Sequence, residues 1–438
     1  MTDLVINNAV VVTSDAKGSV IDKGGVAVEN GRIRQIGPAD EIAPVAAHAA
    51  KVVDGSGHIL MPGIVNTHCH AADSLFRGLV ENLPLEPWLQ TVWQAEGAIL
   101  NPDTSRLGSV LGFAELLLSG VTSVMDMFWY PFETVAAARQ VGLRVSTGGI
   151  FFDPAGVTAL SIDERVAEAR RFFDEFAQAE DVFAASMPHG AYTVSPENLK
   201  AAWAVSHECG GLFCTHCAET RAEQLDIQTR YGRSVVRHLD QLGCLDERTV
   251  LAHCVHLDEE ELDIVARTGA HVAHNPMSNM KLASGFARVP EMLDRGINVS
   301  LGTDGPLSGN DLDMWMTLRL AATMHKGFTG RADLISTRQA FDMLTINGAK
   351  ALGAEDRIGS LEVGKLADMV LVDVKRPHAV PMFDPMTHLV YSTNKSDVRH
   401  VFLGGEQVVR NGELTRMSLD DTLATVEDMV PKIAATIA

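Results

Sequence analysis

The central part of the chain alternates short apolar runs with segments whose apolar residues recur every three or four positions. The first pattern predicts buried strands and the second predicts amphipathic helices. We expect eight strands, at residues 64–68, 121–126, 144–149, 182–189, 212–219, 250–253, 271–275 and 299–304. Helical periodicity separates most of them, for example over residues 162–176, 196–209 and 259–268. Eight such units over about 250 residues predict a (β/α)8 barrel. A doubly wound sheet is the alternative, but its usual glycine-rich first turn is not found in the sequence.

The two ends of the chain have a different pattern, in which β-rich runs follow one another without long helical segments. Asn30-Gly31 and Asn411-Gly412 each separate two such runs, and this dipeptide is a strong signal for a two-residue hairpin turn. We therefore expect residues 1–58 and 360–415 to build one small β domain together. Residues 59–359 would form the barrel, and residues 416–438 a C-terminal helix.

Charge and composition exclude several classes of partner. The chain has 36 basic and 56 acidic residues, which gives a net charge of −20. Such a surface repels phosphate backbones and anionic lipid, so we expect neither nucleic-acid nor membrane partners. We find no signal peptide and no apolar run as long as a membrane span. The six cysteines suit reduced thiols better than a disulfide framework, which favours a cytoplasmic protein.

Side chains suited to metal binding or proton transfer stand at the ends of several predicted strands. The first strand ends in Thr67-His68-Cys69-His70, and the two histidines share a face because successive strand side chains alternate. Later strands end in His189, His216 with Glu219, His253 and Asp304. In a barrel these strand ends converge on one face, where catalytic groups lie.

Three imidazoles and one carboxylate suit zinc or ferrous iron. The proposed ligands of one divalent ion are His68, His70, His216 and Asp304. Zinc is the first choice and iron the alternative. Such an ion lowers the pKa of bound water from about 15.7 towards about 7. Glu219 would then carry the water's proton to the substrate, His253 would stabilise developing charge, and Asp304 would also accept a proton.

Five motifs resemble the amidohydrolase superfamily, in the branch that holds S-adenosylhomocysteine/methylthioadenosine deaminases and triazine hydrolases. They are residues 61–70 (MPGIVNTHCH), 252–254 (AHC), 274–279 (HNPMSN), 302–305 (GTDG) and 359–368 (GSLEVGKLAD). The resemblance covers nearly the whole chain. It implies an α/β fold, with a distorted (β/α)8 TIM-type barrel and a small β-sandwich built from both chain ends. It also implies the metal and catalytic roles given above, and a homo-oligomer.

A second metal ion is not expected. Many two-metal hydrolases on such barrels bridge their ions with a carbamylated lysine at the end of the fourth strand. This chain has no lysine between Lys51 and Lys200, and its fourth strand ends in His189. The sequence therefore predicts a site for a single ion.

Three further residues match substrate-binding positions of the deaminases. In residues 83–89 (LPLEPWL), Trp88 would pack against the bound base, and its alternative role is to anchor a loop. Glu96 matches a glutamate that accepts from ribose hydroxyls, and its alternative is an exposed helix charge. His189 matches a histidine directed at the substrate.

One departure from the family bears on the substrate. The homocysteine-binding deaminases place arginines after the third strand, whereas residues 144–153 (RVSTGGIFFD) continue with glycine, apolar and acidic residues. A substrate carboxylate would lack its bidentate partner. We therefore expect a neutral purine nucleoside, free aminopurine, pterin or aminotriazine rather than S-adenosylhomocysteine.

These observations together predict a metal-dependent hydrolytic deaminase of an amino-substituted N-heterocycle. Metal-bound hydroxide would attack the amino-bearing ring carbon, Glu219 would protonate the ring nitrogen, and ammonia would leave. The alternative is a triazine-type hydrolase that displaces chloride or an alkylamine with the same site. A barrel that has lost catalysis and acts as a scaffold is disfavoured, because none of the expected ligands is missing.

Overall fold

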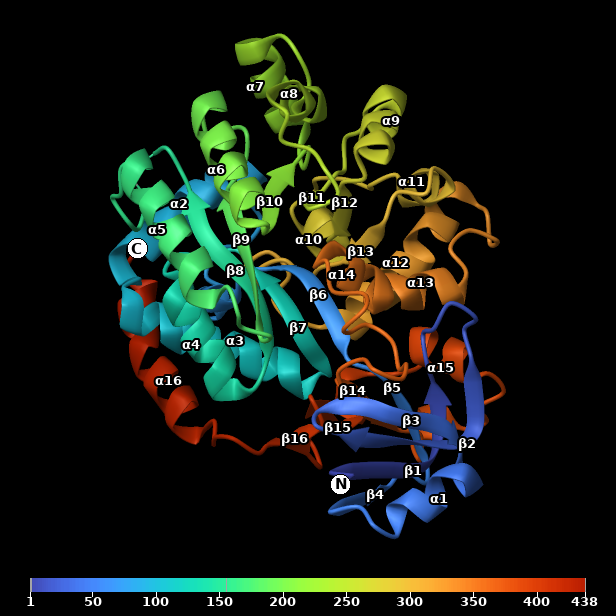
Figure 1. Ribbon diagram of the computed structural model, residues 1–438. Helices are drawn as coiled ribbons and strands as arrows, with labels where there is room; N and C mark the ends of the chain where they lie inside the picture. Colours follow the sequence, from blue (N-terminus) through green and yellow to red (C-terminus); the bar gives the residue numbers. More distant parts are fainter. Residues whose placement is uncertain (1, 155, 438) are drawn as a thin grey trace.

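The computed structural model describes residues 2–154 and 156–437, and its strands form two separate sheets (Figure 1). The larger sheet has eight strands, each hydrogen-bonded in parallel to the next along the chain. They are β6 (Ile64–Cys69), β7 (Val121–Asp126), β8 (Arg144–Phe151), β9 (Val182–Pro188), β10 (Leu212–Cys217), β11 (Thr249–His253), β12 (His271–His274) and β13 (Val299–Leu301). The predicted α/β class and TIM-type barrel are confirmed.

The barrel closes between its first and last strands through a few polar contacts. The Thr67 hydroxyl lies 2.8 Å from the Ser300 hydroxyl and donates to the Leu301 carbonyl at 3.0 Å. Beyond the end of β13, the Asp304 N–H donates to the His68 carbonyl at 3.0 Å. Because of this bond, a residue that follows the last strand lies beside a residue of the first.

Helices follow most barrel strands, and their ends carry ordinary capping signals. The periodicity over residues 162–176, 196–209 and 259–268 corresponds to α5 (Ile162–Phe176), α6 (Pro196–Cys209) and α9 (Glu259–Thr268). Ser161 with Glu164 caps α5, and Asp258 with Glu261 caps α9, each as a reciprocal capping box. The other helices after strands are α3 (Pro102–Leu118), α4 (Pro131–Val141), α7 (Arg221–Tyr231), α8 (Val235–Leu242), α10 (Pro276–Lys281), α11 (Val289–Asp294), α12 (Met314–Thr329), α13 (Thr337–Leu344) and α14 (Ile346–Ala351).

An additional helical segment follows β6 and precedes α3 along the chain. It consists of the 3-10 helix η1 (Ala71–Phe76) and helix α2 (Leu85–Ile99). In α2 the buried side chains include Trp88, Val92 and Glu96, which recur every four residues and so face one side. This helix therefore presents a single face to the barrel mouth.

The smaller sheet joins both ends of the chain. Its strands are hydrogen-bonded in the order β17-β16-β15-β14-β5-β1-β2-β3, with β4 beside β1. They are β1 (Leu4–Val12), β2 (Val20–Glu29), β3 (Arg32–Pro38), β4 (Lys51–Asp54), β5 (His58–Pro62), β14 (Met369–Asp373), β15 (Val398–Leu403), β16 (Glu406–Arg410) and β17 (Glu413–Leu414). The expected β-sandwich strands are thus linked into one nine-stranded sheet, with α1 (Ala39–Ala46) beside it in Figure 1. The domain boundaries stay a prediction, although β5 continues this sheet as far as Pro62.

Both Asn-Gly turns have the backbone that their sequence predicts. Asn30 and Gly31 have φ values of 51° and 73°, and Asn411 and Gly412 have 55° and 83°. Two consecutive positive φ values are the requirement of a type I′ turn, which asparagine and glycine tolerate best. They connect β2 to β3 and β16 to β17.

A buried ion pair holds the smaller sheet against the barrel. The Arg144 guanidinium, at the start of β8, donates twice to the Asp368 carboxylate at 2.7 and 3.1 Å. Asp368 also accepts from the Gly404 N–H at 2.7 Å. Arg144 therefore serves the domain junction, at the opposite end of its strand from the barrel mouth.

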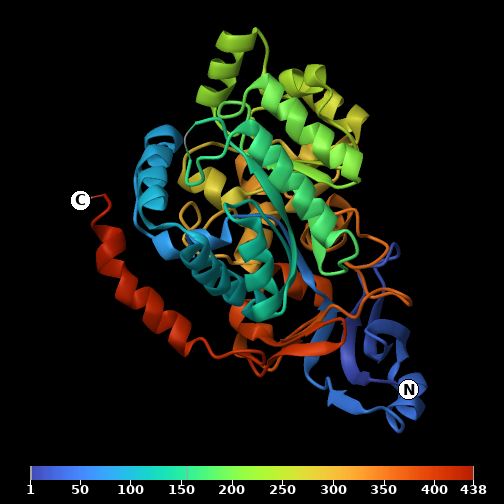
Figure 2. The ribbon, with the colours of Figure 1, turned by 60° about the vertical axis from the view of Figure 1, so that its left-hand side comes forward.

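The C-terminal helix α16 (Asp420–Ala434) runs along the outside of the barrel beside α3 (Figure 2). After it, the Thr436 carbonyl accepts from the Gln94 side chain of α2 at 2.6 Å. The remaining short elements are η2 (Pro377–Ala379), α15 (Pro385–Tyr391) and η3 (Lys395–Asp397). Within the described residues, every helix is too short or too polar to cross a bilayer.

Candidate active site

A cavity opens at the carboxyl ends of the barrel strands. Its polar lining consists of His70, Asp73, Glu96, His189, His216, Glu219, His253 and Asp304. The rest of the lining is apolar or aromatic and comes mainly from α2 and from the segment after β7. All the residues predicted to bind substrate, the proton carrier and most of the predicted ligands therefore meet in one cavity.

At three places in the site, the chain leaves a barrel strand through a residue in the left-handed backbone conformation. The φ values are 50° at Ala218, 74° at His253 and 61° at Asp304. Residues other than glycine rarely adopt this conformation, and it is found most often at functional sites. Here it turns the chain sharply where β10 and β11 end and shortly after β13.

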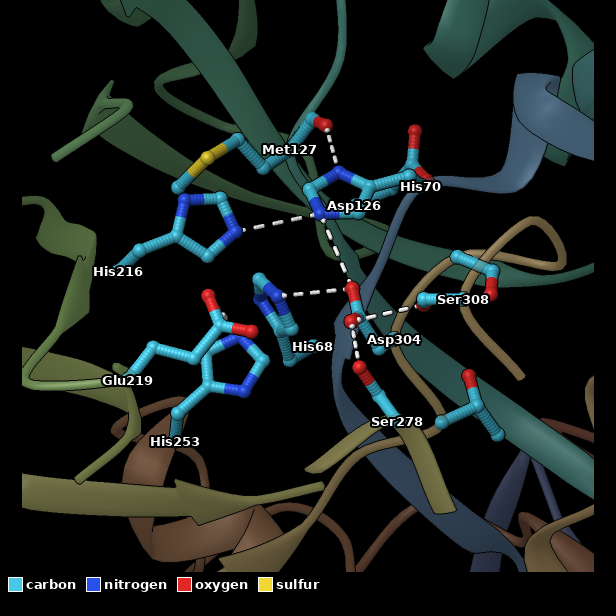
Figure 3. A network of polar contacts seen from close by, with 12 residues as sticks. His68, His70, Asp126, Met127, His216, Glu219, His253, Ser278, Asp304 and Ser308 are labelled. Atoms are coloured by element: carbon cyan, nitrogen blue, oxygen red, sulfur yellow. Dashed lines mark hydrogen bonds and ion pairs between the residues drawn. The ribbon is translucent and has the colours of Figure 1, made fainter. Parts of the chain in front are cut away.

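Backbone carbonyls orient two of the predicted histidine ligands. The His70 Nδ1–H donates to the Met127 carbonyl at 2.7 Å, and the His216 Nδ1–H donates to the His189 carbonyl at 2.6 Å. Because Nδ1 carries the donated hydrogen in each ring, Nε2 is the atom left to face an ion. The two Nε2 atoms lie 3.3 Å apart and face the centre of the site (Figure 3).

The two carboxylate oxygens of Asp304 have different partners. Its Oδ2 accepts from the Ser278 hydroxyl at 2.6 Å and from the Ser308 hydroxyl at 2.8 Å. Its Oδ1 lies 3.3 Å from His68 Nε2 and 3.2 Å from His70 Nε2 (Figure 3). The serines therefore fix the carboxylate so that Oδ1 faces the histidines.

This donor set fits a divalent ion. Ligand atoms of His68, His216, His253 and Asp304 lie within 4.8 Å of one another. His68 is fully buried, its Nδ1 has no hydrogen-bond partner among the described residues, and its Nε2 faces Asp304 Oδ1 at 3.3 Å. A buried imidazole with so few polar contacts is costly unless it binds a ligand. The geometry brings together all four predicted ligands and adds His253 to the cluster, while coordination itself stays a prediction.

Burial sets the charge of His68 and His216, whereas neighbouring groups outweigh it at His70 and Asp304. Burial lowers the pKa of His68 to about 4 and the pKa of His216 well below its usual range, so both rings are neutral at pH 7. Burial also acts against His70, but the Asp304 and Asp73 carboxylates outweigh it and raise the His70 pKa to about 10. Burial opposes ionisation of Asp304, yet His68 and His70 hold its pKa well below the usual range. A cation bound there would displace the proton from His70.

Glu219 stands beside this cluster, and its side chain is hidden from solvent. One of its carboxylate oxygens lies 3.8 Å from His253 Nε2, and the other accepts from the Ser284 hydroxyl at 3.3 Å. Its own N–H donates to Glu223 at 2.7 Å. Burial raises the pKa of Glu219, against the opposing effects of His253 and Ser284. A carboxyl with a raised pKa can both accept and return a proton near neutral pH.

Trp88, Glu96 and His189 all line the cavity. Glu96 is only 5% exposed, and its carboxylate accepts from the Trp129 indole N–H at 3.0 Å. It is therefore not an exposed helix charge. His189 Nδ1 lies 2.8 Å from the Thr193 hydroxyl, and burial together with the nearby histidines lowers its pKa to about 3. Its role towards a substrate stays a prediction.

Two contributors to the site escape sequence reasoning. Asp73 lies in η1, three residues after His70, and burial and the charge of Glu96 raise its pKa well above the usual range. Asn279, at the end of the 274–279 motif, accepts from the His253 ring at 2.8 Å. The motif itself was a signal for Asn279, whereas Asp73 has no comparable signal in the sequence.

Comparison with known proteins decides the family. The model of the amidohydrolase family matches residues 59–408. The chain belongs to the amidohydrolase family. It is 38% identical to a 5-methylthioadenosine/S-adenosylhomocysteine deaminase of Syntrophobacter fumaroxidans over 97% of each chain. It is also 38% identical to a 5'-deoxyadenosine deaminase of Methanosarcina mazei, over 99% of this chain and 100% of the relative.

Solved structures agree with this assignment. A zinc-bound adenosine deaminase of Xanthomonas campestris is 33% identical, covers 99% of each chain and superposes with a TM-score of 0.96. The zinc complex of the atrazine chlorohydrolase TrzN from Arthrobacter aurescens is 25% identical, with a TM-score of 0.90 over 98% of this chain and 100% of that one.

The predictions of a hydrolase that acts on carbon–nitrogen bonds of cyclic amidines, and of a deaminase, are confirmed by these relatives. The predicted dependence on a divalent metal ion is supported by the His and Asp cluster together with the zinc-bound neighbours. The predicted homo-oligomer and the absence of nucleic-acid partners stay predictions.

Proposed function

We propose that this amidohydrolase is a zinc-dependent deaminase of adenine nucleosides whose 5' end is neutral. The observation that carries the proposal is the position of Glu219. Its buried carboxyl lies next to the cluster of histidines and Asp304, and in the same cavity as Trp88 and Glu96. A proton carrier, an ion site and a base-binding wall are the three parts that hydrolytic deamination of a nucleoside needs.

The ion would be held by His68, His70, His216 and Asp304. When bound, it would supply hydroxide at neutral pH by lowering the pKa of water. Zinc suits three imidazoles and one carboxylate, and the structural neighbours with bound zinc support this choice over iron.

The chain's own residues would move the protons. Glu219 would accept the proton that the attacking water loses and deliver it to the ring nitrogen beside the amino-bearing carbon. Addition of the water oxygen makes that carbon tetrahedral. The hydroxyl on that carbon would then give its proton to Asp304, which would pass it to the amino group. The carbon–nitrogen bond breaks, ammonia leaves, and a ring carbonyl remains. His253 would stabilise the charge that develops on the oxygen, from its position 3.8 Å from Glu219.

The cavity's charge supports a substrate without an anionic tail. Among the described residues that line it there is no lysine or arginine, whereas Asp73 and Glu96 add carboxyl groups. The first arginine after β8 is Arg165, whose guanidinium donates to the carbonyls of Ile150 and Thr158. A carboxylate or phosphate at the nucleoside 5' end would therefore be desolvated without a cationic partner.

Ammonia release from a substrate panel tests the proposal. We expect turnover of adenosine, 5'-deoxyadenosine and methylthioadenosine. Adenosine monophosphate and S-adenosylhomocysteine should be at least about tenfold poorer in kcat/KM, because each carries an anionic group into a cavity whose described lining has no lysine or arginine to pair with it. Equal turnover of the charged and neutral nucleosides would contradict the assigned substrate class. Release of chloride or an alkylamine from a triazine, without ammonia from any nucleoside, would favour the triazine-hydrolase alternative.

We also place the enzyme in the cytoplasm. All six cysteines are free thiols and five of them are buried, an arrangement that a reducing compartment maintains.

A further inference from the structure

Helix α10 (Pro276–Lys281) presents two consecutive polar side chains to the site. Ser278 and Asn279 are both fully buried, although they lie side by side in a helix of only six residues. The Ser278 hydroxyl donates to Asp304 at 2.6 Å. The Asn279 side-chain oxygen accepts from His253 Nδ1–H at 2.8 Å. One short helix thus contacts both a predicted metal ligand and the predicted charge-stabilising histidine.

The two contacts differ in whether a second residue makes the same kind of hydrogen bond. Asp304 Oδ2 has a second donor, the Ser308 hydroxyl at 2.8 Å, so the loss of Ser278 leaves one bond in place. The His253 Nδ1 atom has Asn279 as its hydrogen-bond partner on a neighbouring element. His253 also lies at a left-handed backbone position, with φ 74°, just where its strand ends. The ring direction therefore depends on the Asn279 contact.

The backbone of Asn279 is anchored independently of its side chain. Its N–H donates to the Asn275 carbonyl at 3.0 Å, and its carbonyl accepts from the Gly285 N–H at 3.2 Å. Gly285 follows Ser284, whose hydroxyl donates to Glu219 at 3.3 Å. Asn279 therefore supports both the loop of Ser284 and Gly285, which contacts Glu219, and the His253 ring, which faces Glu219.

We propose that Asn279 is a positioning residue, which accepts from the His253 Nδ1–H and so fixes the ring with its Nε2 facing Glu219 and the reacting carbon. This assignment rests on the proposed deaminase function. The amide nitrogen of Asn279 has no hydrogen-bond partner among the described residues. Leaving a buried amide unpaired is unfavourable, and leucine would fill the same volume without that penalty. The amide oxygen is therefore the part of the side chain that this position requires.

Two substitutions separate the effect of the Asn279 acceptor oxygen from the effect of the side chain's volume. Asn279→Leu keeps the volume and removes the acceptor, whereas Asn279→Asp keeps an acceptor oxygen in the same place. We expect Asn279→Leu to lower kcat by about 10- to 100-fold with little change in KM or in metal content. Asn279→Asp should recover most of that loss.

A second background tests whether Asn279 acts through His253. In the His253→Gln enzyme, the additional Asn279→Leu change should cost almost nothing, because the ring that it orients is gone. An equal loss of kcat in both backgrounds would mean that Asn279 is only structural and would overturn the proposal. So would an Asn279→Asp enzyme as slow as Asn279→Leu with its metal bound.

The chain offers a matched control at the other end of the barrel. There the Asn298 amide nitrogen lies 2.9 Å from the His271 ring, outside the cavity lining. Asn298→Leu should lower thermal stability and leave kcat unchanged.

Nitrogen-15 NMR of the histidine rings gives a readout that does not need turnover. The His253 signal, assigned by its loss in His253→Gln, should show Nδ1–H in the native protein and a changed tautomer in Asn279→Leu. An unchanged tautomer would overturn the proposal even if no nucleoside is a substrate, so the two failures are distinguishable.

Discussion

The two halves of the cavity are built in different ways. The metal half consists of side chains at barrel strand ends, and backbone carbonyls of Met127 and His189 orient two of its rings. The substrate half consists of η1, α2 and the segment after β7, and side-chain contacts such as the Glu96–Trp129 bond hold it. The outer side of α2 is held in turn by the chain end, through the Gln94–Thr436 bond.

The metal half and the substrate half therefore determine different properties of the enzyme. Strand register fixes the metal half, so it can change little without loss of the barrel. The substrate half lies on added elements that can change while the sheet is kept. Substitutions in the first half should therefore abolish chemistry for every substrate, whereas substitutions in the second half should discriminate between substrates.

The largest effect is expected from the loss of a ligand. His216→Ala should remove the bound ion and reduce turnover of every nucleoside to background, because an activated water is no longer available. Elemental analysis of the purified variant, together with ammonia release, checks this. Full metal content with normal turnover would exclude His216 from the ligand set.

A smaller and selective effect is expected at Glu96. Glu96→Gln should lower kcat/KM for adenosine by about 10- to 100-fold, because hydrogen bonds to a charged group contribute about 1.5–3 kcal/mol. The same variant should be nearly normal with 2',3'-dideoxyadenosine, which lacks both ribose hydroxyls. An equal loss with both substrates would remove Glu96 from the ribose site.

A still smaller effect is expected at Trp88. Trp88→Leu should raise KM by a few-fold to about tenfold with little change in kcat, since an aromatic stacking contact contributes about 0.5–1.5 kcal/mol. Steady-state kinetics on adenosine measure both constants. If kcat fell instead and KM stayed constant, Trp88 would act on the reacting groups rather than on the bound base.

The smallest effect on chemistry is expected at the domain junction. Asp368→Asn leaves the Arg144 guanidinium buried without its counter-charge, which costs about 3–5 kcal/mol of stability. Thermal or denaturant unfolding measures that loss. The kcat per folded molecule should not change, because Arg144 lies at the opposite end of β8 from the cavity; a lowered kcat would show that the junction influences the site.

The metal half could be predicted from the sequence, and the substrate half only in part. Strand periodicity placed His68, His216 and Asp304 at strand ends, and a parallel barrel brings such ends together without further information. Asp73 and Trp129 could not be found in this way, because their approach to Glu96 depends on how η1, α2 and the segment after β7 pack. The sequence predicted that both β-rich ends build one domain, but no local pattern encodes the pairing of β5 with β14 that joins them into one nine-stranded sheet.

The Glu219→Gln enzyme tests whether Glu219 carries the proton, because glutamine keeps the shape of the side chain and the Ser284 contact but cannot carry a proton. Its metal content and its rate of ammonia release from adenosine should be measured on the same sample. We expect one ion per chain, as in the native protein, and a kcat lowered by about 10²- to 10⁴-fold. Turnover within a few-fold of the native rate, with the ion bound, would contradict the role of Glu219.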